Sequence, residues 1–175
     1  MKESFLAGVF MTAVIISISF DTSAQVQYSK GNNPGVVSYT FRNEFQKDLR
    51  GTLDTIKGYG ITNIEFSNLF GKSAKELRQL LDERGIVCTS FGVSYPDLVN
   101  KTAEVGENAR TLGATYVRVA WIPHGDKGFT LEDAIKTVAD FNKAGELLKE
   151  KYGLVFCYHN HGYEFAKHEN GTFFD

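Results

Sequence analysis

A short unit recurs four times along the chain and constrains the fold more than any other feature. Each copy has a glycine directly before a run rich in β-branched and aromatic residues: YGITNIEF, RGIVCTSF, LGATYVRV and YGLVFCYH, with Gly60, Gly85, Gly113 and Gly153. Glycine commonly follows the last turn of a helix, because it accepts the left-handed backbone conformation there. The runs after it are largely apolar on both faces, as in buried parallel strands. The pattern predicts a helix, a glycine and a buried strand in each copy.

Amphipathic patterns before these glycines predict the helices. The four apolar stripes are Phe45, Leu49, Leu53 and Ile56; Leu77, Leu80 and Leu81; Leu98, Thr102, Val105, Ala109 and Leu112; and Leu131, Ile135, Val138, Leu147 and Leu148. Ser73 with Glu76, and Thr130 with Asp133, have the spacing of an N-terminal capping box. We expect the stripes to pack in the core and to carry no chemistry.

The order of these elements predicts a parallel sheet. With VVSYTF at residues 36–41 as the first strand, strands and helices alternate regularly, and the glycines step by 25, 28 and 40 residues. Regular alternation means a parallel sheet with helices outside. An open doubly wound sheet and a (β/α)8 barrel both fit. No G-x-G-x-x-G or P-loop follows the first strand, which disfavours a nucleotide-binding open sheet.

The first residues are predicted to lie outside this fold. Lys2 precedes an apolar run over residues 5–20, and small residues follow up to Ala24. This is typical of a secretory signal peptide cleaved after Ala24, with an uncleaved membrane anchor as the alternative. We expect residues 1–24 to be the signal peptide and residues 25–35 a flexible lead-in. The protein is then periplasmic or secreted, with no membrane contact after cleavage.

Composition limits the partners and the cysteine chemistry. The chain has 19 basic and 21 acidic residues and a formal net charge of −2, so it lacks the electrostatic footprint of a nucleic-acid-binding protein. Cys88 and Cys157, the only cysteines, fall on the third and fifth predicted strands. Strands two apart in a sheet lie roughly 9.5 Å apart, whereas the Cα atoms of a disulfide lie within about 7 Å. We expect two buried free thiols.

Polar residues gather at three predicted strand ends, where α/β folds place their chemistry. They are Glu65 after the second strand, Arg118, Trp121, His124 and Asp126 after the fourth, and His159, Asn160, His161 and Glu164 after the fifth. If the fifth strand extends that far, alternation puts His159 and His161 on one face. Two imidazoles with a carboxylate just beyond can bind a divalent metal or a sugar hydroxyl. The alternative is hydrogen-bonded packing.

Two of these residues allow a structural interpretation beside the functional one. Glu65 either faces a ligand or pairs with Arg118 as a buried carboxylate, and the two roles can coexist. Trp121 is either a core or rim aromatic or a platform for a sugar ring.

Three segments are similar to the sugar phosphate isomerase/epimerase family of xylose-isomerase-like TIM barrels. They are GYGITNIEFSNLFG at 58–71, LGATYVRVAWIP at 112–123 and YHNHGYEF at 158–165, the last being the most specific. The resemblance runs from about Val36 to the end and implies that residues 36–175 form the first five βα strands of a (β/α)8 barrel. Because a barrel needs eight strands, it also implies a fragment that is unstable and inactive by itself.

The chemistry implied by the resemblance is that of a metal-dependent isomerase or epimerase of sugars or keto-sugars. It removes a proton next to a carbonyl while a divalent metal, Mn²⁺ or Mg²⁺, stabilises the enediolate oxygen. His159 would be a metal ligand where the epimerase branch has a glutamate, and the other ligands would lie beyond Asp175. The catalytic base is unassigned. The residues expected to contact the sugar are Glu65, Trp121, His161 and Glu164.

Other functions fit the same residues. A keto-sugar lyase or dehydratase uses the same proton abstraction. A non-catalytic carbohydrate-binding protein would use the histidines and Trp121 only to hold its sugar. An apurinic-site endonuclease of the related barrel type is disfavoured by export and by the absence of a basic patch.

Overall fold

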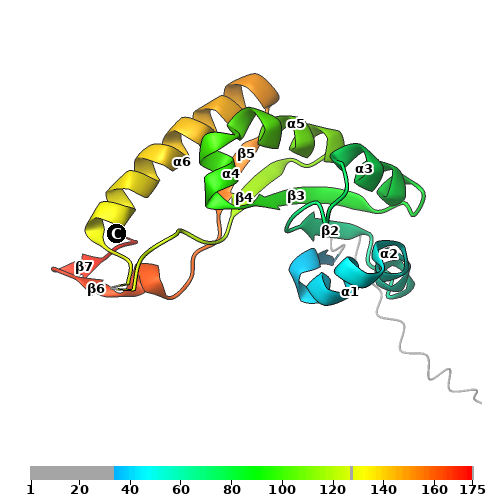
Figure 1. The fold of residues 1–175 in the computed structure, drawn as a ribbon, viewed down its shortest axis with the longest axis horizontal. Coiled ribbons are helices and arrows are strands. Elements are labelled where there is room, and N and C mark those ends of the chain that lie inside the picture. The colour runs from blue at the N-terminus through cyan, green and yellow to red at the C-terminus, as the bar shows by residue number, and fades with distance from the viewer. Residues whose placement is uncertain (1–33, 127, 175) are drawn as a thin grey trace, which may run out of the picture. The chain divides into compact units, whose positions relative to one another are not determined.

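The computed structural model describes residues 34–126 and 128–174, which are built around a five-stranded parallel sheet (Figure 1). The strands are β1 (Gly35–Val37), β2 (Asn63–Phe66), β3 (Val87–Val93), β4 (Tyr116–Val119) and β5 (Val155–Tyr158). Their order in the sheet is the order in the sequence, and every neighbouring pair is parallel. A doubly wound sheet reverses its strand order partway, whereas a barrel adds each strand beside the last. The sheet therefore progresses as in a (β/α) barrel.

Helices connect the strands. They are η1 (Ser38–Phe41), α1 (Arg42–Lys47), α2 (Leu49–Gly58), α3 (Ala74–Asp82), α4 (Tyr95–Asn100), α5 (Thr102–Leu112) and α6 (Leu131–Tyr152). After β5 come η2 (Tyr163–Phe165) and the short antiparallel hairpin of β6 (Lys167–His168) and β7 (Gly171–Thr172). Helices α3, α5 and α6 lie side by side along one face of the sheet (Figure 1). None of the described helices combines the length and apolarity needed to cross a bilayer.

The core lies between the helices and this outer face of the sheet. The strands alternate, so that Ile64 and Phe66 of β2 and Val117 and Val119 of β4 are buried against the helices. The helix residues buried with them are Leu53, Ile56, Leu77, Leu81, Leu112 and Leu148. Burial of this apolar surface is the main favourable contribution to folding.

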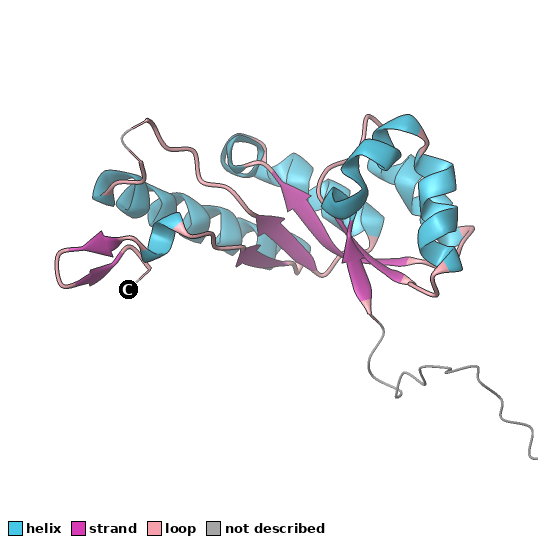
Figure 2. Cartoon of the chain, turned by 90° about the horizontal axis from the view of Figure 1, so that it is seen from below, coloured by secondary structure: helices cyan, strands magenta, loops and turns pink. Residues whose placement is uncertain are grey.

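The opposite, inner face of the sheet is less covered. Val87, Tyr116 and Val155 lie near the amino ends of their strands and are exposed. The strands are rotated successively from one to the next, as in twisted sheets (Figure 2). In a closed barrel this face would line the interior.

The first strand and the first helical stripe differ from the sequence-based expectation. The first strand ends at Val37 instead of Phe41, because Ser38 turns into η1 and its buried hydroxyl accepts a hydrogen bond from the Ser67 amide at 2.8 Å. The first apolar stripe is buried, but Asp48 divides it between α1 and α2. Its carboxylate accepts from the Gly51 amide at 3.0 Å and starts a new helix there.

The stripe predicted for α6 is buried only in part. Leu148 lies in the core, whereas four other members are exposed: Leu131, Ile135, Val138 and Leu147. The prediction that the whole stripe packs in the core is therefore wrong. These four side chains do not share one face of α6, and none of them is covered within residues 34–126 and 128–174.

The cysteines lie in β3 and β5, as the pattern predicts, and both are free thiols. Cys88 is buried, and this burial raises the pKa of its thiol to about 11. Cys157 is only partly buried, contrary to the prediction, because it is paired in register with Arg118 on the inner face. The predicted signal peptide and residues 25–33 of the predicted lead-in lie outside the described residues, and Gly35 already belongs to β1.

The helix-to-strand turns match the sequence pattern. Gly60, Gly85, Gly113 and Gly153 have φ angles of 77°, 60°, 78° and 66°, the left-handed conformation that glycine tolerates best. Both predicted capping boxes form, at Ser73 with Glu76 and at Thr130 with Asp133. These signals begin and end the helices that position each strand.

The free-energy cost of placing a residue other than glycine in the left-handed conformation can be measured at Gly153. A Cβ atom at Gly153 or at Gly58 would meet no heavy atom within 4 Å, so the two positions differ mainly in backbone conformation. We expect Gly153→Ala to lower the free energy of unfolding by about 1–2 kcal/mol. The matched change Gly58→Ala, at the end of α2, should raise it by up to about 1 kcal/mol. Urea unfolding measures both, and equal effects would contradict the assignment.

Candidate functional site

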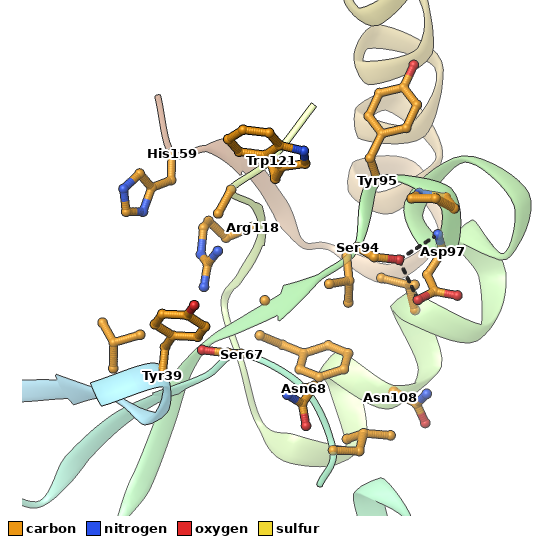
Figure 3. A pocket seen from close by; sticks show the side chains of 18 of the residues that line it. Tyr39, Ser67, Asn68, Ser94, Tyr95, Asp97, Asn108, Arg118, Trp121 and His159 are labelled. Carbon is orange, nitrogen blue, oxygen red and sulfur yellow. Dashed lines mark hydrogen bonds between the residues drawn. The ribbon is translucent and has the colours of Figure 1, made fainter. Parts of the chain in front are cut away.

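The carboxyl ends of all five strands border a cavity of about 1050 Å³ (Figure 3). Each strand or the residue after it supplies lining: Val37, Ser67, Gly92, Arg118 and His159, in strand order. These ends meet at one edge because every strand pair is parallel. The fold thus brings together residues that are far apart in the sequence.

A partly buried ion pair forms one wall. Arg118 donates to Glu65 Oε1 from Nε at 2.9 Å and from Nη2 at 2.5 Å. The two side chains are 12% and 21% exposed, so each charge is largely removed from water and needs the other. Arg118 lines the cavity, whereas Glu65 lies behind it and is not part of the lining. The pair that the sequence allowed as one of two interpretations of Glu65 is present.

Gly92 makes room for this pair. It is the register partner of Arg118 in the neighbouring strand. A Cβ atom at Gly92 would lie 2.6 Å from Arg118 Nη2 and 3.1 Å from the carbonyl oxygen of Phe66. The guanidinium can therefore lie flat across β3 only because this residue has no side chain.

His159 and His161 both line the cavity, but for a different structural reason from the one predicted. The fifth strand ends at Tyr158, so strand alternation does not place them. The chain turns after the His159 amide donates to the Val119 carbonyl at 2.9 Å. The two imidazoles then stack with centroids 5.1 Å apart and planes 18° apart. His159 is exposed, and His161 Nδ1 is a buried atom without a hydrogen-bond partner among the described residues.

Trp121 lies beside the histidines at the rim. It lines the cavity and is 52% exposed, with the His161 ring edge-on at 5.6 Å. Tyr163 packs against it edge-on at 5.1 Å. An exposed indole held in this way offers an apolar surface with a polar edge. Its neighbour His124 is bonded to the Ile122 carbonyl oxygen at 2.8 Å and does not line the cavity.

Glu164 occupies a different place from the other predicted site residues. Its side chain is buried and is not part of the cavity lining. The carboxylate accepts hydrogen bonds from the Tyr158 hydroxyl and, at 2.8 Å, from the His161 amide. Burial and the adjacent Glu164 raise the pKa of Tyr158, so that its hydroxyl remains a donor. Asp126 is exposed and lies outside the lining as well.

Several lining residues were not singled out from the sequence. Tyr39 of η1, Asn68 after β2, Tyr95 of α4 and Asn108 of α5 all border the cavity (Figure 3). Asn68 and the Ser94–Tyr95 pair follow strand ends, which was a usable signal. Tyr39 also follows a strand end, but the sequence pattern placed it inside the first strand. Asn108 carries no such signal, because it lies within α5 and helix packing brings it to the cavity.

Tyr95 is fixed by contacts to α6. Its hydroxyl donates to Asp140, which also pairs with Lys136 at 2.6 Å. Lys136 and the Tyr95 hydroxyl lower the pKa of Asp140, so that the carboxylate stays charged. Burial and Asp140 raise the pKa of Tyr95. The bonds tie α4, and with it one side of the cavity, to α6.

The described residues do not form a complete metal site by themselves. His159 and His161 present imidazoles to the cavity, and the unpaired His161 Nδ1 has unused hydrogen-bonding or ligand capacity. No group of three or more His, Cys, Asp or Glu side chains in residues 34–126 and 128–174 is arranged to hold a metal ion. This part of the chain therefore fits one or two ligands of a site and not a complete one.

Comparison with known proteins identifies the fold. No protein-family model and no curated protein sequence matches the chain. A sugar phosphate isomerase/epimerase from Parabacteroides distasonis superposes with a TM-score of 0.68 at 21% identity, over 87% of this chain and 62% of that one. An L-ribulose 3-epimerase superposes at 0.54 and 18% identity, over 71% of this chain and 48% of that one.

A third structure agrees with these two. A xylose isomerase domain-containing protein from Salmonella typhimurium superposes at a TM-score of 0.54 and 14% identity, over 71% of this chain and 47% of that one. The described residues thus form part of a (β/α) barrel, as predicted. The names of these structures, sugar phosphate isomerase/epimerase, xylose isomerase domain-containing protein and L-ribulose 3-epimerase, are those of the family that the sequence segments resemble. The chain spans about half to three-fifths of these structures.

The ion pair can be tested by a double-mutant cycle. Arg118→Met leaves the Glu65 carboxylate partly buried without its partner, so we expect a loss of about 2 kcal/mol in unfolding free energy. The double variant Arg118→Met/Glu65→Leu should lose less than the sum of the single changes, as measured by urea unfolding. The surface pair Arg50–Glu83, at 3.5 Å, is the control and should couple by less than about 0.5 kcal/mol. Additive effects at Arg118 and Glu65 would contradict this account.

Proposed function

We propose that these residues belong to a sugar or keto-sugar isomerase or epimerase that removes a proton next to a carbonyl. The observation that carries the proposal is the cavity at the carboxyl ends of the five strands, lined by Arg118, Trp121, His159 and His161. Active sites of (β/α) barrels lie at this end. The structural neighbours named sugar phosphate isomerase/epimerase and L-ribulose 3-epimerase support the same class.

The lining residues suit a small polyhydroxylated substrate. The Arg118 guanidinium has N–H groups beyond the two that Glu65 accepts, and these can donate to a substrate hydroxyl or carbonyl oxygen. The imidazole of His161 can donate to or accept from a hydroxyl. The exposed face of Trp121 can stack on the C–H face of a sugar ring. Glu65 then acts by holding Arg118, and no described residue is assigned as the proton-abstracting base.

We further propose that the reaction depends on a divalent metal, Mn²⁺ or Mg²⁺. When bound, the ion would supply Lewis-acid polarisation of a substrate oxygen. His159 is the ligand proposed from this part of the chain, because its exposed imidazole borders the cavity. Since the described residues hold no complete ligand set, we propose that the other ligands come from outside them and that residues 1–175 alone are inactive.

The setting proposed for the protein is extracytoplasmic. Residues 1–24 have the pattern of a signal peptide, which supports a periplasmic or secreted enzyme acting on a small-molecule sugar. With a net charge of −2, the chain is not expected to bind nucleic acid.

A deuterium-exchange assay tests the reaction. The full-length gene product, its reading frame established by sequencing past the codon for Asp175, is incubated in D₂O with ketoses such as L-ribulose and D-fructose. We expect loss of the proton signal next to the carbonyl in the NMR spectrum, because that proton exchanges with solvent. Chelation should abolish exchange and Mn²⁺ should restore it. The chain ending at Asp175 should show no exchange.

Controls separate the competing functions. His159→Ala should lower the exchange rate at least about tenfold, whereas His168→Ala, which changes a histidine outside the cavity lining, should not. Loss of water from a keto-sugar in place of isomerisation would assign a lyase. Sugar binding that survives chelation, without exchange, would assign a carbohydrate-binding protein and reject the enzyme.

A further inference from the structure

Glu164 is a buried carboxylate that the proposed reaction does not use. Its side chain is 3% exposed. Carboxylates are rarely buried unless donors compensate for the lost water, because an unpaired buried charge is strongly unfavourable. The donors that surround Glu164 therefore indicate what the residue does.

Both oxygens of Glu164 are occupied. Oε1 accepts from the Tyr158 hydroxyl, and Oε2 accepts from the His161 amide at 2.8 Å. Tyr158 is the last residue of β5, and His161 follows three positions later. The carboxylate thus bridges the two ends of the turn after β5, Tyr158 and His161. Glu164 itself is not part of the cavity lining.

Tyr163 extends this closure to the neighbouring strand end. Its hydroxyl lies 2.9 Å from the Tyr158 hydroxyl and accepts from the Ile122 amide at 3.0 Å. Ile122 directly follows Trp121, so the network joins the loop after β4 to the turn after β5.

The same turn after β5 arranges the rings of His159, His161 and Tyr163. His161 stacks on Tyr163 with centroids 5.8 Å apart and planes 7° apart, and His159 stacks on His161 at 5.1 Å. The backbone of His161 is bonded to Glu164, and the hydroxyl of Tyr163 is bonded to Tyr158. The stack therefore depends on a backbone that the carboxylate holds.

We infer that Glu164 is a positioning residue, which fixes the turn after β5 so that His159 and His161 face the cavity together, and that it does not contact the ligand. The value of this arrangement for a sugar site rests on the proposed function. The arrangement itself does not, and it can be tested without sugar or metal.

The test reads ring-to-ring contacts by NMR in the full-length gene product with isotope-labelled histidine and tryptophan. The reference protein should show nuclear Overhauser effects between the rings of His159 and His161 and between His161 and Trp121. Glu164→Ala should lose these effects while the rest of the spectrum stays folded. Glu164→Gln should retain them, because its amide oxygen can accept from the His161 amide and its NH₂ group can donate to the Tyr158 hydroxyl oxygen.

Two further variants complete the design. Tyr158→Phe removes one donor and should weaken the same effects, and it decides the question if Glu164→Ala does not fold. Phe165→Ala changes the neighbouring exposed residue, which stacks on Phe174, and should leave the effects unchanged. The inference is overturned if folded Glu164→Ala or, where that variant does not fold, Tyr158→Phe keeps the reference pattern. It is also overturned if Glu164→Gln loses the pattern as Glu164→Ala does.

The outcome is independent of the sugar assays. A protein that shows no deuterium exchange but loses the ring contacts in Glu164→Ala would keep this inference and lose the proposed function. If the reference protein shows deuterium exchange but Glu164→Ala keeps the ring contacts, the proposed function is kept and this inference is lost.

Discussion

Parallel strand pairing is the constraint on which the rest of this structure depends. Because each strand runs in the same direction as its neighbour, Val37, Ser67, Gly92, Arg118 and His159 all arrive at one edge of the sheet. Parallel pairing in turn requires that the chain return to the opposite edge after each strand. The helices provide this return, and left-handed glycines at their ends turn the backbone into the next strand. The cavity is thus a consequence of backbone geometry before it is a consequence of side-chain chemistry.

Local signals were sufficient to predict most of the fold. The four glycines, the capping boxes and the apolar runs act over a few residues, and the strands and helices lie where they indicate. Failures came where tertiary contacts override the local pattern. Ser38 leaves the predicted strand because its hydroxyl binds the Ser67 amide 29 positions away. The exposed residues of α6 show that apolar residues in a helix do not by themselves indicate which of them are buried.

The candidate site was predictable in its residues more than in its geometry. Strand-end position correctly singled out Arg118, Trp121, His159 and His161 as neighbours. Strand-end position could not show that Arg118 lines the cavity whereas Glu65 does not. That arrangement depends on Gly92, because a side chain at this position would collide with the Arg118 guanidinium. Nor could strand-end position show that Glu164 turns inward. A carboxylate three residues after a histidine can point either way, and the donors Tyr158 and His161 decide between them.

The strand order has a consequence for how the chain is made. Each strand pairs with the one that precedes it in the sequence, so every strand pairing in the sheet closes a loop that contains only helices and their turns. The entropy cost of closing a loop rises with its length, so this order avoids the longer loops that pairing of distant strands would need. A chain leaving the ribosome can therefore add one βα unit at a time to a sheet that already exists. Among the described residues, Val87, Tyr116 and Val155 stay exposed to water on the inner face of the sheet built in this way.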